Sequence, residues 1–215
     1  MKSILVIGVG HFGRHLIRKL NELNTQVMAV DIDEESVNAV LSYVDSAQIG
    51  DSTNVEFLSQ LGVSDFDAVI VTITDDFQTS LETASLLKDL GARHVVSRAS
   101  SDIQEKFLLR NGADEVVYPE KQLAAWTCIR CTSDHVFDYI DLGGEHSIFE
   151  VSVPNEWVGR NVLQINVRQQ YGINILGVRK NGILNTLIKP ETTFEAGMTV
   201  LVLGAEKTIT KYFRI

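Results

Sequence analysis

The most constraining stretch of this chain is an apolar run near its start that leads into a glycine-rich turn. Residues 4–7 are four consecutive aliphatics, a pattern typical of a parallel-sheet strand that is buried on both faces. Gly8, Gly10 and Gly13 follow with the spacing Gly-x-Gly-x-x-Gly. Gly8 would permit a tight turn, Gly10 would let a diphosphate approach the backbone, and Gly13 would let the next helix pack closely on the strand.

That helix is predicted to begin near Phe12, because apolar residues over 16–23 recur at spacings that form one stripe. Its free N–H groups and the positive end of its dipole would face an anion beside the turn. His11 and Phe12 are therefore candidate binding residues together with the three glycines.

An acidic residue ends the second strand, which is expected at 27–30. Asp31 lies 18 residues beyond Gly13, near the spacing of about 20 that is typical of a carboxylate accepting hydrogen bonds from ribose hydroxyls. This carboxylate would repel a 2′-phosphate, which favours NAD or an adenosine nucleotide over NADP. Ile32, the next residue, joins the candidate set. The alternative is a glycine-rich turn in an unrelated α/β protein.

Composition limits the other possibilities. The 215 residues with 45% hydrophobic content allow a buried core in one large or two small domains. No apolar run approaches the roughly 20 residues that cross a bilayer, and no signal-peptide pattern precedes the first strand, so we expect an intracellular protein without direct membrane insertion. The net charge of −9 argues against nucleic acid as a partner, because phosphate contacts need clustered Lys and Arg.

Strand-like and helix-like stretches alternate through residue 118, with further strands expected at 47–49, 68–73, 94–98 and 115–118. This alternation predicts a Rossmann-like, doubly wound α/β sheet with right-handed crossovers and strand order 3-2-1-4-5-6. Ligands bind such sheets beyond the carboxyl ends of the strands, where the order reverses. The polar candidates at this edge are Asp31, Asp51, Ser52, Thr74, Asp75, Asp76 and Arg98.

Several of these residues also have a purely structural interpretation. Asp51 is either an acceptor near the adenine or its ribose, or a helix N-cap. Asp75 and Asp76 have the same two interpretations, with capping favoured. Arg98 either pairs with a phosphate or is an exposed residue at a strand end.

The pattern changes after Pro119. Residues 121–136 contain no glycine or proline and are predicted to form one helix, followed by a short helical stretch over 137–140. The apolar side of the long helix, with Trp126 and Ile129, must be covered, which indicates a partner subunit. Cys128 and Cys131 are expected to be buried packing thiols. A metal or redox role is the alternative, although two thiols alone cannot complete a tetrahedral zinc site.

Residues 147–215 are predicted to form a small α+β lobe. Strands are expected at 147–153, 173–178 and 199–203, a helix at 162–170, a final helix through Phe213, and a hairpin turn at Asn181 and Gly182. This lobe has no glycine-rich loop, and its acid and base candidates are scattered, so it does not look like a catalytic half.

Seven segments along the chain form a distinctive series. They are Gly8-Val9-Gly10-His11-Phe12-Gly13, Ala29-Val30-Asp31, Gly50-Asp51-Ser52-Thr53, Asn111-Gly112-Ala113-Asp114, Pro119-Glu120-Lys121, Asp138-Tyr139-Ile140-Asp141, and Asn166-Val167-Arg168 with Tyr171-Gly172. In this order they resemble a known family, the cytosolic Ktr/Trk regulatory subunits of bacterial potassium uptake systems, which are built from RCK domains. The resemblance spans nearly all 215 residues, and Ktr is favoured because only one N-lobe and one C-lobe are present.

The resemblance implies a nucleotide-binding N-lobe at 1–119, crossover helices for dimerisation at 120–142, and a C-lobe at 143–215. It implies that the N-lobe binds ATP, ADP or NAD(H), and that homodimers assemble into an octameric ring. The ring would lie in the cytoplasm, beneath a membrane potassium channel or transporter subunit whose gating it controls. Glu120 would lie near the nucleotide phosphates and help to hold a cation, or it is simply an acid at a helix N-terminus.

His11 stands where relatives that discriminate ATP often have Arg, and this difference favours ADP or NAD(H). Arg14 is either a compensating phosphate partner or a solvated helix residue. In some relatives the C-lobe binds cyclic di-AMP, although an ordinary strand would explain the same apolar residues. The matching positions here are Arg168, Ile173, Asn174, Ile175 and Pro190.

A non-enzymatic regulator is thus the expected function. The main alternative is an NAD-dependent oxidoreductase with a reduced substrate domain, which needs a proton donor or acceptor near the nicotinamide. The second lobe offers no evident one, since His135 and His146 lie by the hinge. A nucleotide sensor with some other partner is a third possibility.

Overall fold

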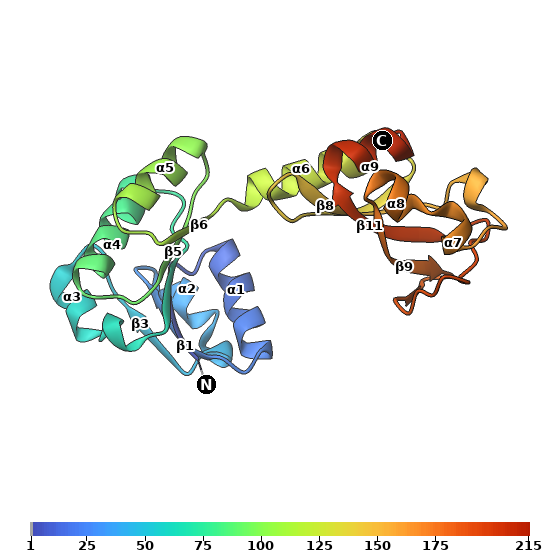
Figure 1. The fold of residues 1–215 in the computed structure, drawn as a ribbon. Helices are drawn as coiled ribbons and strands as arrows, with labels where there is room; N and C mark the ends of the chain where they lie inside the picture. The colour runs from blue at the N-terminus through green and yellow to red at the C-terminus, as the bar shows by residue number, and fades with distance from the viewer. Residues whose placement is uncertain (1) are drawn as a thin grey trace. The chain divides into compact units, whose positions relative to one another are not determined.

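The computed structural model describes residues 2–215, which divide into two compact units between residues 120 and 121. Strands β1 to β6 belong to the first unit, and strands β7 to β11 belong to the second (Figure 1). In the described part of the chain, no helix has both the length and the apolar content needed to span a membrane.

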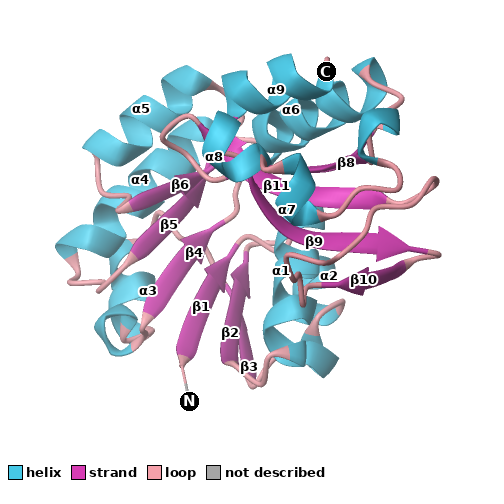
Figure 2. Cartoon of the chain, turned by 45° about the vertical axis from the view of Figure 1, so that its right-hand side comes forward, coloured by secondary structure: helices cyan, strands magenta, loops and turns pink. Residues whose placement is uncertain are grey.

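The first unit contains a six-stranded parallel sheet with the order β3-β2-β1-β4-β5-β6 (Figure 2). The order reverses at β1, which pairs with β2 on one side and with β4 on the other. The predicted doubly wound α/β fold and its strand order are therefore confirmed. The strands are β1 (Ser3–Ile7), β2 (Gln26–Asp31), β3 (Ser46–Ile49), β4 (Ala68–Val71), β5 (Val95–Arg98) and β6 (Glu115–Val117).

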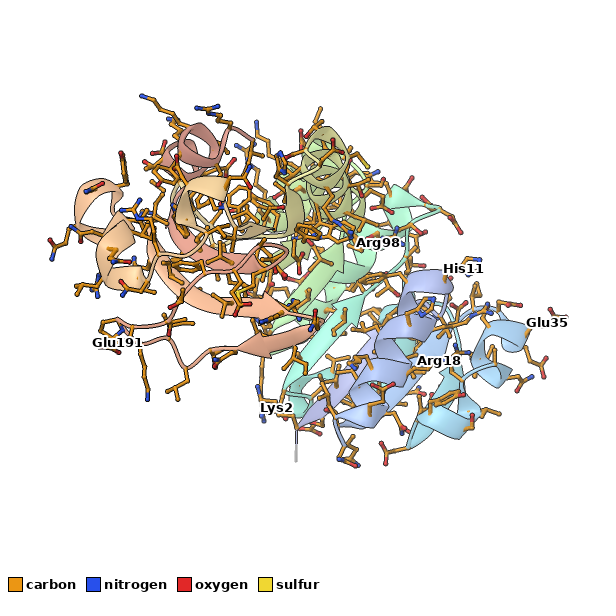
Figure 3. All side chains as sticks on the ribbon, turned by 90° about the vertical axis from the view of Figure 1, so that its right-hand side faces the viewer. Lys2, His11, Arg18, Glu35, Arg98 and Glu191 are labelled. Atoms are coloured by element: carbon orange, nitrogen blue, oxygen red, sulfur yellow. The ribbon has the colours of Figure 1, made fainter. Side chains whose placement is uncertain are left out.

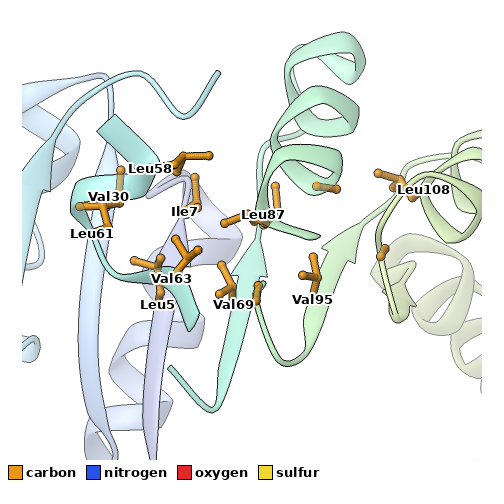
Figure 4. Packing of buried hydrophobic residues seen from close by; sticks show 14 of the residues in the cluster. Leu5, Ile7, Val30, Leu58, Leu61, Val63, Val69, Leu87, Val95 and Leu108 are labelled. Carbon is orange, nitrogen blue, oxygen red and sulfur yellow. The ribbon is translucent and has the colours of Figure 1, made fainter. Parts of the chain in front are cut away.

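Helices cover both faces of this sheet, and each face has its own core. Leu5 and Ile7 of β1 pack with Leu87 on one face, whereas Val6 packs with Ile17 on the other. Successive side chains of a strand point to opposite faces, so the run of consecutive aliphatics in β1 serves both cores; Figure 4 shows the first of them. The helices are α1 (His11–Glu22), α2 (Glu34–Asn38), α3 (Val55–Gln60), α4 (Phe77–Asp89) and α5 (Asp102–Arg110), with 3-10 turns η1 (Leu41–Tyr43) and η2 (Val63–Asp65).

The segment after β6 corrects two predictions. Helix α6 (Pro119–Thr132) ends four residues before Val136, and the stretch predicted to be helical at 137–140 belongs to strand β7 (Val136–Asp141). Strand β7 pairs antiparallel with β8, which places Tyr139 opposite Phe149 with their ring centroids 4.9 Å apart. A short apolar stretch is compatible with both a helix and a strand. This stretch forms a strand because the neighbouring strand β8 pairs with its backbone N–H and C=O groups.

The second unit is built on a five-stranded antiparallel sheet with the order β10-β9-β11-β8-β7. Its predicted hairpin is confirmed, because Asn181 and Gly182 have φ values of 51° and 79° and join β9 to β10. The predicted helix at 162–170 is instead two short helices, since Asn166 between them is left-handed with φ 51°. The elements are β8 (His146–Ser152), η3 (Asn155–Trp157), α7 (Val162–Ile165), α8 (Val167–Tyr171), β9 (Asn174–Lys180), β10 (Ile183–Asn185), β11 (Thr199–Ala205) and α9 (Glu206–Phe213).

Candidate functional site

The glycine-rich turn joins the end of β1 to the start of α1. Gly8 has a φ of +97°, a conformation that favours glycine, and a Cβ at Gly13 would overlap the carbonyl oxygen of Gly8. The hydroxyl of Thr72, directly after β4, donates a hydrogen bond of 2.5 Å to that same carbonyl. The sheet itself therefore holds this turn in place, with no ligand required.

Gly10 is different from the other two glycines. Its φ of −67° and ψ of −171° are accessible to any residue. A Cβ at Gly10 would meet nothing within 4 Å in the described residues. Neither backbone strain nor packing within residues 2–215 therefore explains a glycine here, whereas the approach of another molecule to the backbone would explain it.

The N-terminus of α1, which follows Gly10, has no side-chain cap and no acidic residue in its first turn. Its free N–H groups and the positive end of its dipole are open to an anion. The other four helices of the first sheet have their first turns satisfied internally. Their capping side chains are Asp33 for α2, Asn54 for α3, Asp76 for α4 and Ser101 for α5.

A cleft of about 460 Å³ lies at the carboxyl ends of the strands beside this turn. Its volume falls within the range of about 300–1,000 Å³ typical of small-molecule sites. The lining comes from the ends of β1 and β2 and from the segments after β3 and β4. The sequence-predicted residues that line it are Gly8, Gly10, Asp31, Ile32, Asp51, Ser52, Thr74, Asp75 and Asp76.

Four predicted residues lie outside the cleft lining, namely His11, Phe12, Gly13 and Arg98. His11 is exposed at the first residue of α1, and Arg18 lies further along the same helix (Figure 3). The guanidinium carbon of Arg98 lies 5.1 Å from the centroid of the Phe12 ring. The same guanidinium forms an ion pair with Glu120.

Asp31 ties the end of β2 to the glycine-rich turn. One of its carboxylate oxygens accepts a hydrogen bond of 2.5 Å from the N–H of Val9, and the other accepts one of 2.9 Å from the N–H of Asp33. A carboxylate has about four acceptor positions. Both oxygens can therefore also accept from hydroxyl groups of a ligand in the cleft.

Three aspartates that follow β3 and β4 differ in their hydrogen bonds. Asp51 does not cap a helix, because it accepts hydrogen bonds from the hydroxyl and N–H of Thr53, at 2.7 and 2.8 Å, and these bonds lower its pKa. Asp76 is the N-cap of α4, and its bonds with Thr79 lower its pKa. Asp75 is exposed and has no hydrogen-bond or ion-pair partner within residues 2–215.

The cleft is acidic. Its titratable lining residues are aspartates, and within the described chain no Lys, Arg or His lines it. Arg14 lies outside the cleft lining and stabilises the glycine-rich turn. Its Nε donates to the carbonyl of Val9 at 2.8 Å, and its Nη2 donates to the Ser36 hydroxyl at 3.3 Å. An anionic group bound here would therefore be met chiefly by backbone N–H groups and the dipole of α1.

Sequence reasoning missed the hydroxyl residues of the site. The missed residues are Thr72, whose hydroxyl donates to the Gly8 carbonyl, Ser36, whose hydroxyl accepts from Arg14, and Thr83, whose hydroxyl lies 2.8 Å from that of the predicted residue Ser52. Thr72 directly follows β4 and pairs with the end of β1 through its own N–H. Its position near the end of the strand expected at 68–73 was visible in the sequence, but nothing there indicated which carbonyl its side chain would reach.

Comparison with known proteins agrees with this geometry. The family model described as "TrkA-N domain" matches residues 4–119, and the "TrkA-C domain" model matches residues 147–215. Ktr system potassium uptake protein C of Bacillus subtilis is 35% identical, over 98% of this chain and 96% of that protein. The chain belongs to the Ktr/Trk potassium uptake family. Ktr system potassium uptake protein A of the same organism is 33% identical, over 98% and 95% of the two chains.

Solved RCK-domain structures share the fold of this Ktr/Trk chain. The GsuK channel superposes with a TM-score of 0.73 at 22% identity, over 99% of this chain and 39% of that one. The GsuK channel bound to NAD superposes with a TM-score of 0.71 at 21% identity, over the same shares. This chain thus spans less than half of the GsuK channel, and the similarity concerns the fold.

The C-lobe residues matched to a cyclic di-AMP site have mixed environments. Ile173 is fully buried in the core of the second unit, Ile175 and Asn174 are half-buried, and Arg168 and Pro190 are exposed. Ile173 directly precedes β9, and its place in the core accounts for this apolar residue without a ligand, because its side chain is not accessible. A separate cleft of about 660 Å³, with His135 and Arg214 in its lining, includes none of these five residues.

The cysteine prediction is wrong in one respect. Cys128 and Cys131 on α6 are both free and exposed in this chain, rather than buried. No group of three or more His, Cys, Asp or Glu side chains within residues 2–215 is arranged to hold a metal ion. Helix α6 as a whole has no buried residue in this chain.

Proposed function

We propose that this protein is a nucleotide-sensing regulatory subunit of a potassium uptake system. Membership of the Ktr/Trk family supports the assignment to potassium uptake. The observation that carries the nucleotide assignment is Gly10, which lies beside an uncapped helix N-terminus and at which no contact within residues 2–215 requires a glycine.

In this proposal the adenosine part of the nucleotide occupies the acidic cleft. Asp31 and Asp51 accept hydrogen bonds from ribose or adenine, and the exposed side chain of Ile32 contacts the base. The diphosphate lies against Gly10 and the first turn of α1. ADP, ATP and NAD(H) share these parts. The GsuK channel has been solved with NAD, which makes NAD a reasonable first ligand to test.

We further propose that the chain acts as a homodimer through residues 120–142, and that dimers assemble into an octameric ring at the cytoplasmic side of a membrane potassium channel or transporter subunit. The side chain of Leu123 on α6 is apolar and exposed. This exposure supports the proposal that a partner subunit covers α6 in the assembly. A nucleotide can shift such a ring only by the difference in its affinity for two geometries.

Oxidoreductase activity is not the function we favour. Hydride transfer to or from the carbon of a carbonyl or alcohol substrate needs a proton donor or acceptor beside the oxygen of that group. The aspartates that line the cleft bind backbone N–H groups or cap helices, except for Asp75. We expect no substrate-dependent change in NADH absorbance.

The decisive experiment is calorimetric titration of the full chain with ATP, ADP, NAD⁺ and NADH, together with light scattering of the free and bound protein. Saturable binding of at least one nucleotide, with a changed mass or shape, is expected. Failure of all four to bind would contradict the proposal. Co-purification with a membrane potassium transporter subunit would test the partner.

Two additional ligands remain proposals. Glu120 is proposed to lie near a cation at the phosphates. The C-lobe is proposed to bind cyclic di-AMP through Arg168, Asn174, Ile175 and Pro190. Titration of the full chain with cyclic di-AMP tests the second, and Arg168→Ala should weaken any binding that is seen.

A further inference from the structure

The two thiols of α6 lie on the side of this helix that faces away from the core of the second unit. Trp126 and Ile129 are half-buried, since the indole N–H of Trp126 donates to Asp138 at 2.9 Å and Ile129 packs against that core. Cys128 and Cys131 each follow one of these two residues by two positions, which is a step of about 200° around an α-helix. Both thiols are therefore exposed on the opposite side of α6.

Packing within the described chain does not explain two cysteines at these positions. A free cysteine is among the residue types most often buried in proteins, but both of these are exposed and neither forms a disulfide. Their spacing is Cys-x-x-Cys, with Ile129 and Arg130 between them. This spacing is typical of one half of a tetrahedral zinc site.

Helix geometry favours a shared metal ion over a disulfide between the two thiols. Residues i and i+3 of an α-helix have Cβ atoms about 5–6 Å apart, whereas a disulfide needs a Cβ separation of about 3.5–4.5 Å. A disulfide between Cys128 and Cys131 would therefore distort α6. Two thiolates on one tetrahedral zinc ion, with Zn–S bonds of about 2.3 Å, hold their sulfurs about 3.8 Å apart. Side-chain rotation reaches this separation from an undistorted helix.

The surroundings of the pair also disfavour a redox role. Redox-active thiols are typical of helix N-termini or of sites beside Lys, Arg or His, but this pair lies near the C-terminal end of α6. The guanidinium carbon of Arg130 lies 4.6 Å from the centroid of the Trp126 ring, so this cation is turned toward Trp126. A metal ion needs no such activation, because its own charge displaces the thiol protons to solvent.

One chain supplies only two of the four ligands that such a site needs. Within residues 2–215 no group of three or more His, Cys, Asp or Glu side chains is arranged to hold a metal ion. In a homodimer with a two-fold axis, a residue near the axis lies beside its own copy in the partner. A second copy of this chain can therefore complete the site with an identical pair of thiols.

We propose that Cys128 and Cys131 of two copies of this chain bind one thiophilic metal ion, with Zn²⁺ as the expected species, in a four-thiolate site on the dimer axis. Four thiolates in tetrahedral coordination are typical of structural zinc. The ion links the two α6 helices and stabilises the dimer, because it binds the assembled form. The proposal rests on the homodimer through residues 120–142 proposed above and does not depend on nucleotide binding.

The test is a Co²⁺ titration of the full chain after reduction with a phosphine and removal of metal with a chelator. Thiolate complexes of Co²⁺ absorb strongly in the near ultraviolet, and light scattering reports the mass of the same samples. We expect the absorption to saturate at one ion per two chains and Zn²⁺ to displace Co²⁺. Zn²⁺ should also raise the thermal stability of the wild type.

Cys128→Ser and Cys131→Ser should each abolish the cobalt–thiolate absorption and retain the circular dichroism spectrum. Thr127→Ser is the matched control, because Thr127 is an exposed neighbour of Cys128 and both thiols remain; it should bind Co²⁺ as the wild type does. The metal site would be overturned by saturation at one ion per chain, by absorption that survives either cysteine substitution, or by an assembled protein that binds no Co²⁺. A protein that stays monomeric under all conditions would overturn both the site and the homodimer on which it rests.

Discussion

Substitution of Gly10 by alanine separates ligand binding from folding. The backbone of Gly10, with φ −67° and ψ −171°, accepts alanine without strain, and the new methyl group would meet nothing within 4 Å among the residues that the structure describes. A Gly→Ala change at such a position stabilises a protein by about 0.4–1 kcal/mol, because it reduces the freedom of the unfolded chain. We therefore expect the thermal stability of Gly10→Ala to be equal to or slightly above that of the wild type.

Nucleotide binding should respond in the opposite direction. The methyl group would project into the space proposed for the diphosphate, and overpacking by one carbon typically costs about 1–3 kcal/mol. Since each 1.4 kcal/mol is a factor of ten in affinity, Gly10→Ala should bind ADP about five- to 150-fold more weakly. Calorimetric titration with ADP and NAD⁺ measures the affinity, and differential scanning calorimetry measures the stability.

Gly13→Ala is the matched comparison at the same turn. Its methyl group would overlap the carbonyl oxygen of Gly8, so this variant should lose thermal stability whether or not nucleotide is present. If Gly10→Ala bound ADP as tightly as the wild type does, the phosphates could not lie against this residue. If Gly10→Ala unfolded at a markedly lower temperature, the conclusion that a methyl group fits at this position would be refuted.

Three further predictions concern both units. Thr72→Val removes the hydroxyl that donates to the Gly8 carbonyl. Leaving this acceptor unpaired should lower the free energy of unfolding by about 1–3 kcal/mol and weaken ADP binding. An unchanged denaturant-unfolding curve would refute this prediction. Glu150 pairs with Arg179, which lowers the pKa of Glu150 below its ordinary 4.5. The ionised carboxylate therefore stabilises the fold above about pH 4.5 and loses this effect as pH falls; Glu150→Gln should melt lower than the wild type at pH 7, with a gap that closes toward pH 3. Leu123→Glu should lower the mass measured by light scattering and keep the circular dichroism spectrum, whereas an unchanged mass would exclude α6 from the dimer interface.

Local patterns were sufficient for most of the first unit. The consecutive aliphatics of β1, the alternation of strands and helices through residue 118, and the glycine spacing predicted the sheet order correctly. They succeeded because a parallel strand buried on both faces and a glycine that must adopt φ of +97° leave signals within a few residues. The hairpin at Asn181 and Gly182 was predictable for the same reason, since its two residues both adopt positive φ.

Predictions failed where long-range partners decide the outcome. Strand β7 was taken for a helix because its pairing with β8 is not visible in its own sequence. Cys128 and Cys131 were expected to be buried, but burial depends on which elements cover α6. Arg98 was expected to be either a phosphate partner or an exposed strand end; it is half-buried, and the fold brings Glu120, 22 residues later, to its side, while the phosphate role stays a prediction.

The amino-acid sequence by itself determined the glycine-rich turn, the order of the parallel sheet and the family, because short, contiguous sequence patterns are sufficient to predict each of them. Only the tertiary structure decided that Gly10 faces free space, that Thr72 holds the turn, and that Arg98 is held by Glu120 with its Nε unpaired. These are contacts between elements distant in the chain, and their distances and angles follow from how the sheet and its helices pack.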